Sequence, residues 1–155
     1  SREPGVVGAA LDAPGSWCGI IVDGHPVHPA RLRNAVAAKP RGKTLLVTDA
    51  MPPVGADDPS YVLNGETIFV KDGICQTADG VLAGSALDMA AAVRNSVEML
   101  GLPLDEAVRM ASTYPADFLG LGASHGRIAV GCRADLVAMD ADCNIHRSWI
   151  GGQPS

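Results

Sequence analysis

Two short apolar runs that each lead into an aspartate predict strands buried on both faces. They are Trp17–Val22, followed by Asp23, and Thr44–Thr48, followed by Asp49. A continuous apolar run of this length is typical of a strand in a parallel sheet, because helices cover both faces of such a sheet. Between them, Pro29–Ala38 has apolar residues at helical spacing and begins with a proline, which suits a first helical turn. The order strand, helix, strand therefore predicts a βαβ unit.

The segment that follows, Tyr61–Val81, favours a β-hairpin excursion. Its two β-type runs, Glu66–Val70 and Ile74–Thr77, flank an Asp-Gly pair. This dipeptide is a common hairpin turn, because both of its residues accept a left-handed backbone conformation. A second such pair, Asp79-Gly80, predicts a further turn.

The longest helix is expected over Ser85–Leu100. Ser85 is a favourable N-cap residue, Asp88 stands in the capping-box position three residues later, and Gly101 is expected to end the helix. The expected inward face of this helix consists of Leu87, Ala90, Ala91 and Val97.

The last third of the chain predicts two short helices and then a run of strands. The expected helices are Leu104–Ser112 and Pro115–Leu119, and the expected strands are Arg127–Val130, Ala134–Met139 and His146–Ile150. The two buried strands near the start of the chain are of barrel type, but two strands cannot close a barrel. The chain is therefore expected to be the end of a larger structure.

The composition is that of an acidic globular protein. Of the 155 residues, 47% are hydrophobic and 19% are charged, and the net charge is -5. These values disfavour disorder and, because no basic cluster is present, also disfavour a nucleic-acid partner. No apolar run approaches the roughly 20 residues of a membrane span, and the first residues do not resemble a signal peptide. A cytoplasmic location is expected. In that location free thiols are more common than disulfides, so we expect free thiols at the four scattered cysteines, Cys18, Cys75, Cys132 and Cys143.

Asp49 is the first candidate for a chemical role. It stands at the carboxyl end of a predicted parallel strand, and catalytic groups of α/β barrels lie at that end. Pro52-Pro53 then ends any regular structure. A cap for the turn after the strand is the alternative role for such an aspartate, and the spacing alone leaves both open.

The chain resembles the N-acetylglucosamine-6-phosphate deacetylases of the amidohydrolase superfamily. The matching stretches occur in the family's order over nearly the whole chain: Arg2-Glu3-Pro4-Gly5, Cys18–Gly24, Leu46–Ala50, Leu82–Leu87, Ala107–Ala116 and Gly126–Val137.

This resemblance implies an α/β fold, namely the C-terminal part of a metal-dependent (β/α)8 barrel plus the C-terminal strands of a small β-sandwich domain. Residues 1–122 would belong to the barrel, with the hairpin excursion at about 61–82, and residues 123–155 to the sandwich. The first two predicted strands would be the seventh and eighth of the barrel. The family also implies a homodimer and a phosphosugar substrate that is cleaved to acetate and glucosamine 6-phosphate.

The resemblance also implies roles for individual residues. Asp49 matches the family's catalytic aspartate, and Arg2 matches the arginine that grips the sugar phosphate in the neighbouring subunit's site. Two segments match those that contact substrate, and they are the loop Asp23-Gly24-His25-Pro26 and the segment Leu82-Ala83-Gly84. Pro26 departs from the family, because it stands where a phosphate-binding histidine is expected; His25 or His28 is the candidate to replace it.

The family further implies a divalent metal, zinc or iron, held by a glutamate and two histidines. Those ligands match no position in this chain, so this chain by itself is expected to bind no metal. Asp23, His25 and His28 lie close enough in sequence to suggest a metal site, although the prolines around them favour a turn. Two other functions stay open. The chain is either an inactive truncated product that self-associates through uncovered strand edges, or an amidohydrolase acting on a different amide.

Overall fold

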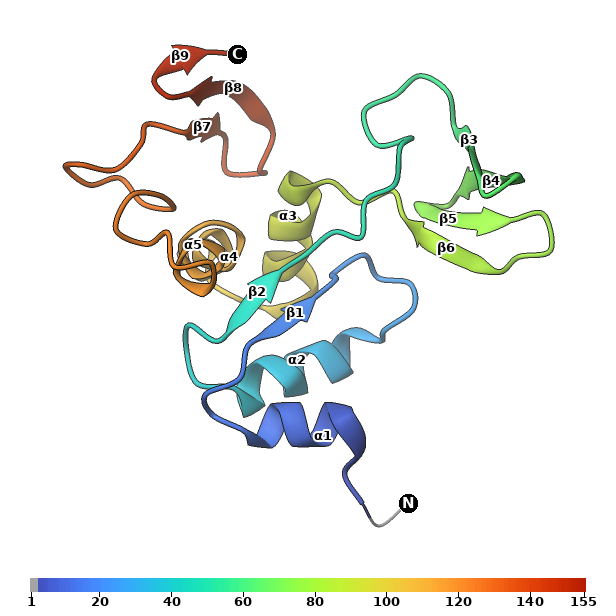
Figure 1. Ribbon diagram of the computed structural model, residues 1–155, viewed down its shortest axis with the longest axis horizontal. Coiled ribbons are helices and arrows are strands. Elements are labelled where there is room, and N and C mark those ends of the chain that lie inside the picture. The colour runs from blue at the N-terminus through green and yellow to red at the C-terminus, as the bar shows by residue number, and fades with distance from the viewer. Residues whose placement is uncertain (1–2) are drawn as a thin grey trace.

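A computed structural model describes residues 3–155 of the chain (Figure 1). The helices are α1 (Gly5–Asp12), α2 (Pro29–Ala38), α3 (Met89–Leu100), α4 (Leu104–Ala111) and α5 (Thr113–Phe118). The strands form three sheets and are β1 (Cys18–Ile20), β2 (Thr44–Leu46), β3 (Ser60–Leu63), β4 (Glu66–Lys71), β5 (Ile74–Thr77), β6 (Leu82–Ser85), β7 (Leu136–Met139), β8 (Ile145–Ile150) and β9 (Gln153–Pro154). None of the described helices is both long and apolar enough to cross a membrane.

The predicted βαβ unit is confirmed by β1, α2 and β2. The two strands are parallel, with Cys18 opposite Thr44 and Ile20 opposite Leu46. In Figure 1, α2 lies on one side of this pair and α3, α4 and α5 lie on the other. Burial on both sides explains why β2 carries two leucines and the β-branched Thr44, since all three of its residues are buried. The pair forms the centre of the core, together with apolar residues of α3 and α4.

Helix α2 begins where the sequence predicts. Pro29 takes the first helical position, and His28 caps the helix by accepting a hydrogen bond from the backbone N–H of Ala30 at 3.2 Å, through Nδ1. Leu32 is the buried contact of this helix with the core. His28 therefore has a local structural role.

The predicted start of the longest helix at Ser85 is wrong. Ser85 belongs to β6, and its hydroxyl accepts a hydrogen bond from the backbone N–H of Leu87 at 3.0 Å. Asp88 is the actual N-cap, because its carboxylate accepts from the backbone N–H of Ala91 at 2.7 Å. Gly101 ends α3 in the left-handed conformation, with φ 71°, as predicted.

The inward face of α3 also differs from the predicted one. Ala92, Val93, Ser96 and Leu100 are the buried residues of the helix. Of the predicted face, Leu87 is buried but precedes the helix, whereas Ala91 and Val97 are only partly buried against the core. The buried face is rotated from the predicted one, because packing against α4 and β2 decides which side of α3 faces the core.

The hairpin excursion is a four-stranded antiparallel sheet in the order β3-β4-β5-β6. The predicted hairpin of β4 and β5 is confirmed, but β3 and β6 were missed. Asn64-Gly65 forms the turn between β3 and β4, with φ 53° and 85°. This dipeptide is one of the strongest hairpin signals in a sequence, so β3 was open to prediction.

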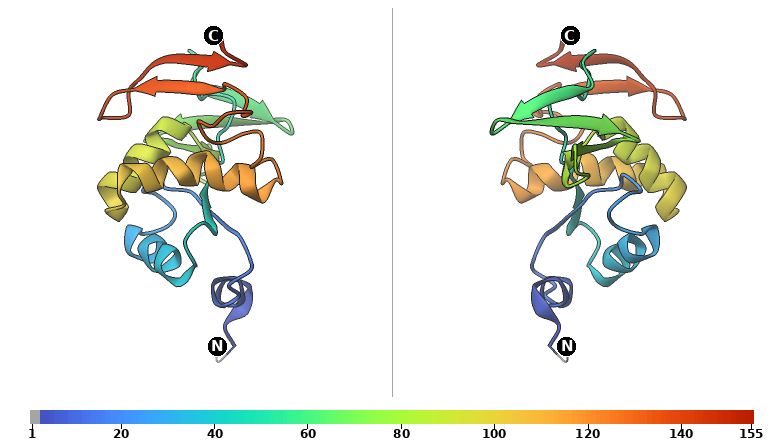
Figure 2. Two further views of the ribbon diagram at one scale, coloured as in Figure 1. Left: turned by 90° about the vertical axis from the view of Figure 1, so that its left-hand side faces the viewer. Right: turned by 90° about the vertical axis from the view of Figure 1, so that its right-hand side faces the viewer.

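The C-terminal sheet has the order β7-β8-β9, and its first turn packs on α3. Cys143, in that turn, is buried in the core, and Arg94 of α3 donates to the backbone carbonyl of Asp142 at 2.7 Å. Both views in Figure 2 show this sheet at the opposite end of the molecule from α1. The predicted strand Arg127–Val130 is wrong, because this stretch pairs with no described strand and exposes Val130 fully.

All four cysteines are free thiols, as expected. Cys75 and Cys143 are buried, whereas Cys18 and Cys132 are partly exposed. Buried free cysteines behave as small apolar side chains.

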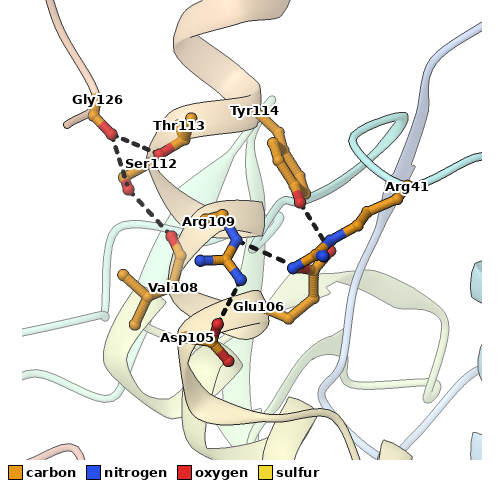
Figure 3. A network of polar contacts seen from close by, with 9 residues as sticks. All are labelled: Arg41, Asp105, Glu106, Val108, Arg109, Ser112, Thr113, Tyr114 and Gly126. Atoms are coloured by element: carbon orange, nitrogen blue, oxygen red, sulfur yellow. Dashed lines mark hydrogen bonds and ion pairs between the residues drawn. The ribbon is translucent and has the colours of Figure 1, made fainter.

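A polar network joins the amino end of β2 to α4 and α5 (Figure 3). The carboxylate of Glu106 accepts two hydrogen bonds from the Arg41 guanidinium, at 2.7 and 2.9 Å, one from Arg109 at 3.2 Å and one from the Tyr114 hydroxyl at 2.8 Å. Arg109 also pairs with Asp105. This cluster ties the turn before β2 to two helices that follow it by some 60 residues, so its role is structural.

Glu106→Gln is expected to lower the free energy of unfolding at pH 7 by about 1–2 kcal/mol, because it removes the charge that three donors share at a partly exposed site. Urea denaturation measures the change. Asp117→Asn is the control, since it breaks one exposed ion pair with Arg127 at 2.6 Å and is expected to have a smaller effect.

The same network predicts a loss of stability in acid. Burial by itself raises the pKa of Glu106, but hydrogen bonds from Arg41, Tyr114 and Arg109 outweigh it and hold the pKa below its ordinary value. A lowered folded-state pKa stabilises the protein above the unfolded pKa, about 4.3 for glutamate. The stabilisation is lost as the pH falls through the folded pKa, and Glu106→Gln should therefore reduce the difference in stability between pH 7 and pH 3.

Candidate active site

Asp49 lies just beyond β2, and backbone hydrogen bonds hold it there. The backbone N–H of Val47 still bonds to the carbonyl of Ile20 at 3.0 Å, so the parallel pair reaches almost to Asp49. The carbonyl of Asp49 then accepts from the N–H of Ser85 at 2.9 Å, and the carbonyl of Ser85 accepts from Met51 at 3.0 Å. Asp49 itself is left-handed, with φ 53°, and is exposed. This costly conformation persists because β6 fixes the backbone on both sides of it.

Gly84 allows β6 to approach Asp49 this closely. Its φ is 123°, and a Cβ on it would lie 2.5 Å from Cγ of Met51 and 3.2 Å from the carbonyl oxygen of Asp49. A side chain at this position would push β6 away from the end of β2. The structure thus brings the segment Leu82–Gly84 next to Asp49.

The loop after β1 lies at the same end of the parallel pair. Asp23 accepts a hydrogen bond from the backbone N–H of His25 at 3.1 Å, which folds the loop back on itself. Asn95 of α3 donates to the carbonyl of Val22 at 2.7 Å and so holds the end of β1. The imidazole of His25 lies against Gly73, because a Cβ there would be 3.3 Å from its Nε2.

The turn that His25 contacts is in turn bonded to the end of β6. The carbonyl of Gly73 accepts from the backbone N–H of Ala86 at 3.0 Å. Gly24 and Pro26 are exposed in the same loop. One side of the molecule is therefore formed by the loop after β1, the β4–β5 turn and β6. Asp49 lies on this side, next to Ser85 at the end of β6.

Two further residues, Cys75 and Tyr61, lie near Asp49, although no sequence motif pointed to them. Burial, and then the nearby charge of Asp49, raise the pKa of the Cys75 thiol. Burial and the charges of Cys75 and Asp49 also raise the pKa of Tyr61. Alternation along the strands could have placed both on the inward face of the sheet, since Cys75 pairs with Gly84, and Tyr61 pairs with the buried Ile68.

Arg2, expected to bind a phosphate, lies outside the described residues, and the remaining expected site residues are all described.

The chain matches the family model described as "Amidohydrolase family" over residues 9–154. It belongs to the amidohydrolase family.

Several named amidohydrolase relatives are deacetylases of phosphosugars. An N-acetylgalactosamine-6-phosphate deacetylase of Escherichia coli O157:H7 is 43% identical over 98% of this chain, and an N-acetylglucosamine-6-phosphate deacetylase of Vibrio furnissii is 39% identical over 98%. The chain spans 40% and 38% of the length of these relatives. A shorter relative from E. coli K12 is also 43% identical, and the chain covers 90% of it.

Solved structures of such enzymes have the same fold over this length. The N-acetylglucosamine-6-phosphate deacetylase of Pasteurella multocida superposes with a TM-score of 0.91 at 40% identity, over 97% of this chain and 39% of that one. An aspartate-to-alanine mutant of the Mycobacterium smegmatis enzyme, in complex with N-acetyl-D-glucosamine-6-phosphate, gives 0.84 at 34% identity, over 94% and 39%. The coverage agrees with the expectation that the chain corresponds to a C-terminal portion of these proteins.

Amidohydrolases are generally metal-dependent, but the described residues do not form a metal site. Among residues 3–155, no group of three or more His, Cys, Asp and Glu side chains lies close enough to hold an ion. Asp23 and His28 instead make local backbone hydrogen bonds, and His25 packs on Gly73. This amidohydrolase chain thus carries an acid–base candidate without a metal-ligand set in its described part.

Gly84→Ala is expected to destabilise the junction at Asp49 by about 1–3 kcal/mol, through both its backbone conformation and the contact with Met51. Gly80→Ala is the matched control, because its φ of 82° is also positive but a Cβ there meets nothing within 4 Å. Thermal melting of the two variants measures the difference. Equal losses of stability would contradict a close approach at Gly84.

Proposed function

We propose that the chain supplies the C-terminal part of the active site of a metal-dependent deacetylase. The substrate is an N-acetylhexosamine 6-phosphate, and the products are acetate and the hexosamine 6-phosphate. The observation that carries this proposal is the exposed Asp49, held by β6 at the carboxyl end of a parallel strand. The substrate class is supported by the names of relatives whose alignments cover 98% of this chain.

Asp49 acts as the base and then as the acid of the reaction. Hydrolysis of an acetamide requires a water that loses a proton as it attacks the carbonyl carbon, and an amine that gains one as it leaves. A carboxylate at the site performs both transfers, taking the proton from the water and passing it to the nitrogen. A hydrogen bond to Ser85 holds the backbone of Asp49, and so the Cα from which the carboxylate extends, at the end of β6.

The segments around Asp49 bind the sugar phosphate. Arg2 grips the phosphate, for which a guanidinium fork is well suited, and reaches the site of the neighbouring subunit of a homodimer. The loop Asp23-Gly24-His25-Pro26 and the backbone of Leu82-Ala83-Gly84 contact the substrate. Pro26 has neither an imidazole nor a backbone N–H, so His25 is the residue of this loop with a side chain able to bind the phosphate.

The intact enzyme is a (β/α)8 barrel with a small β-sandwich domain. Residues 1–122 belong to the barrel and 123–155 to the sandwich. Two observations support this assignment. The strands β1 and β2 pair in parallel, and the chain covers 39% of the Pasteurella multocida and Mycobacterium smegmatis structures. The metal, zinc or iron, is held by a glutamate and two histidines outside these 155 residues. The enzyme acts in the cytoplasm.

The second candidate function is that of an inactive remnant that self-associates. It is favoured by the uncovered apolar side chains of the described residues, of which Ile128 is 91% and Val6 88% exposed. The parallel sheet has only two strands in residues 3–155, so both of its outer edges are open to pairing. A third possibility, a different amide substrate, is favoured by Pro26.

Acetate release from N-acetylglucosamine 6-phosphate and N-acetylgalactosamine 6-phosphate, with added Zn²⁺ or Fe²⁺, tests the proposed function. Asp49→Asn is expected to lower the rate at least about 100-fold, because a positioned acid–base group contributes that much or more. Asp79→Asn, in the turn between β5 and β6, is the matched control and should keep full activity. An active Asp49→Asn variant would contradict the role of Asp49. Because the metal ligands are proposed to lie outside these residues, the assay uses the chain fused to the part of the Vibrio furnissii relative that it does not cover, and an inactive wild-type fusion would favour the remnant.

The remnant candidate predicts that the chain sediments as a dimer or larger species at micromolar concentration. Replacing Ile128 and Val130 by serine should shift the species toward the monomer, because it removes two of the most exposed apolar side chains. A wild-type chain that sediments as a single monomer would contradict this candidate.

A further inference from the structure

Tyr61 points toward the candidate site from the far edge of the β3–β6 sheet. It pairs with Ile68 on β4, which pairs with Thr77 on β5, and both partners are buried. The next residue, Val62, has the opposite orientation and is 68% exposed. Because side chains alternate along a strand, the ring of Tyr61 lies on the inward face of the sheet.

The phenol of Tyr61 reaches across this face to β6. Its hydroxyl donates to the backbone carbonyl of Ala83 at 3.4 Å, although β3 and β6 are at opposite edges of the sheet. Burial, and then the nearby Cys75 and Asp49, raise the pKa of the phenol. The hydroxyl therefore contacts the proposed substrate-contact segment and lies near the proposed base.

This hydroxyl can still bind a second group. Donation to Ala83 uses the phenol proton, and the lone pairs of the oxygen stay able to accept a hydrogen bond. At 3.4 Å the bond is also long, so little is lost if the hydroxyl turns toward a ligand. A sugar hydroxyl is a suitable partner, because it donates as well as accepts.

The relatives differ in the sugar that their names give. Some are N-acetylgalactosamine-6-phosphate deacetylases and others are N-acetylglucosamine-6-phosphate deacetylases. The two sugars differ only in the orientation of the hydroxyl at C4. A polar group that meets this hydroxyl in one orientation can discriminate between them, because a site built to bond a hydroxyl rejects a ligand that lacks it there.

We propose that Tyr61 is a specificity-determining residue that accepts a hydrogen bond from the C4 hydroxyl of one of these two phosphosugars. The inference rests on the proposed function, since it assumes that the substrate lies over Asp49 and Ala83. It adds a residue from β3 to a site otherwise formed by the ends of β1, β2 and β6.

The test compares the binding of N-acetylglucosamine 6-phosphate and N-acetylgalactosamine 6-phosphate by isothermal titration calorimetry, which needs no turnover. The chain has two tyrosines, which gives a matched pair of variants, Tyr61→Phe and Tyr114→Phe. Tyr61→Phe is expected to weaken binding of the preferred sugar about 2- to 10-fold, which corresponds to one neutral hydrogen bond. The affinity for the other sugar should stay unchanged. Tyr114→Phe should lower the melting temperature, because Glu106 loses a donor, and keep the preference.

The possible outcomes separate the inference from the proposed function. A wild-type chain that binds neither sugar overturns both. Binding of both sugars with equal affinity, a preference that survives Tyr61→Phe, or an equal loss for both sugars overturns only the role of Tyr61. A second variant, Tyr61→Met, removes the same hydroxyl with a different apolar side chain, and the inference requires both variants to reduce the preference while retaining a cooperative thermal transition.

Discussion

The short backbone bridge between β6 and the end of β2 determines how the candidate site is arranged. Ser85 bonds to Asp49 through its N–H and to Met51 through its carbonyl, at 2.9 and 3.0 Å. These bonds join the antiparallel sheet to the parallel pair, and they hold Asp49 in a conformation that a residue with a side chain rarely adopts. This contact requires a glycine at position 84, because a Cβ there would clash with Met51. The position of the proposed base is thus a property of the backbone around it.

The two ends of β2 have different physical roles. At the amino end, the Glu106 carboxylate accepts hydrogen bonds from Arg41, Arg109 and Tyr114. These bonds connect the turn before the strand to α4 and α5. At the carboxyl end, the side chain of Asp49 is exposed, and only its backbone is bonded to β6. This division agrees with the proposed barrel, since in barrel strands one end stabilises the fold and the other carries the chemistry.

The proposed active site is only partly formed by these residues. Catalytic groups of a barrel come from the ends of several strands, and the described chain has two parallel strands. It accordingly holds an acid–base candidate and two segments able to face a substrate. The open sheet edges and the exposed apolar side chains are consistent with the shorter length of the chain relative to the deacetylases it matches.

The sequence by itself determined the elements whose signals are local. Apolar periodicity and Pro29 predicted the βαβ unit, and an Asp-Gly pair predicted the β4–β5 hairpin, because a few neighbouring residues decide these conformations. The family resemblance singled out Asp49. Only the tertiary structure decided that Ser85 extends β6 instead of capping α3, and that Tyr61 lies near Asp49. These outcomes depend on hydrogen bonds and burial between residues far apart in sequence, which no local pattern contains.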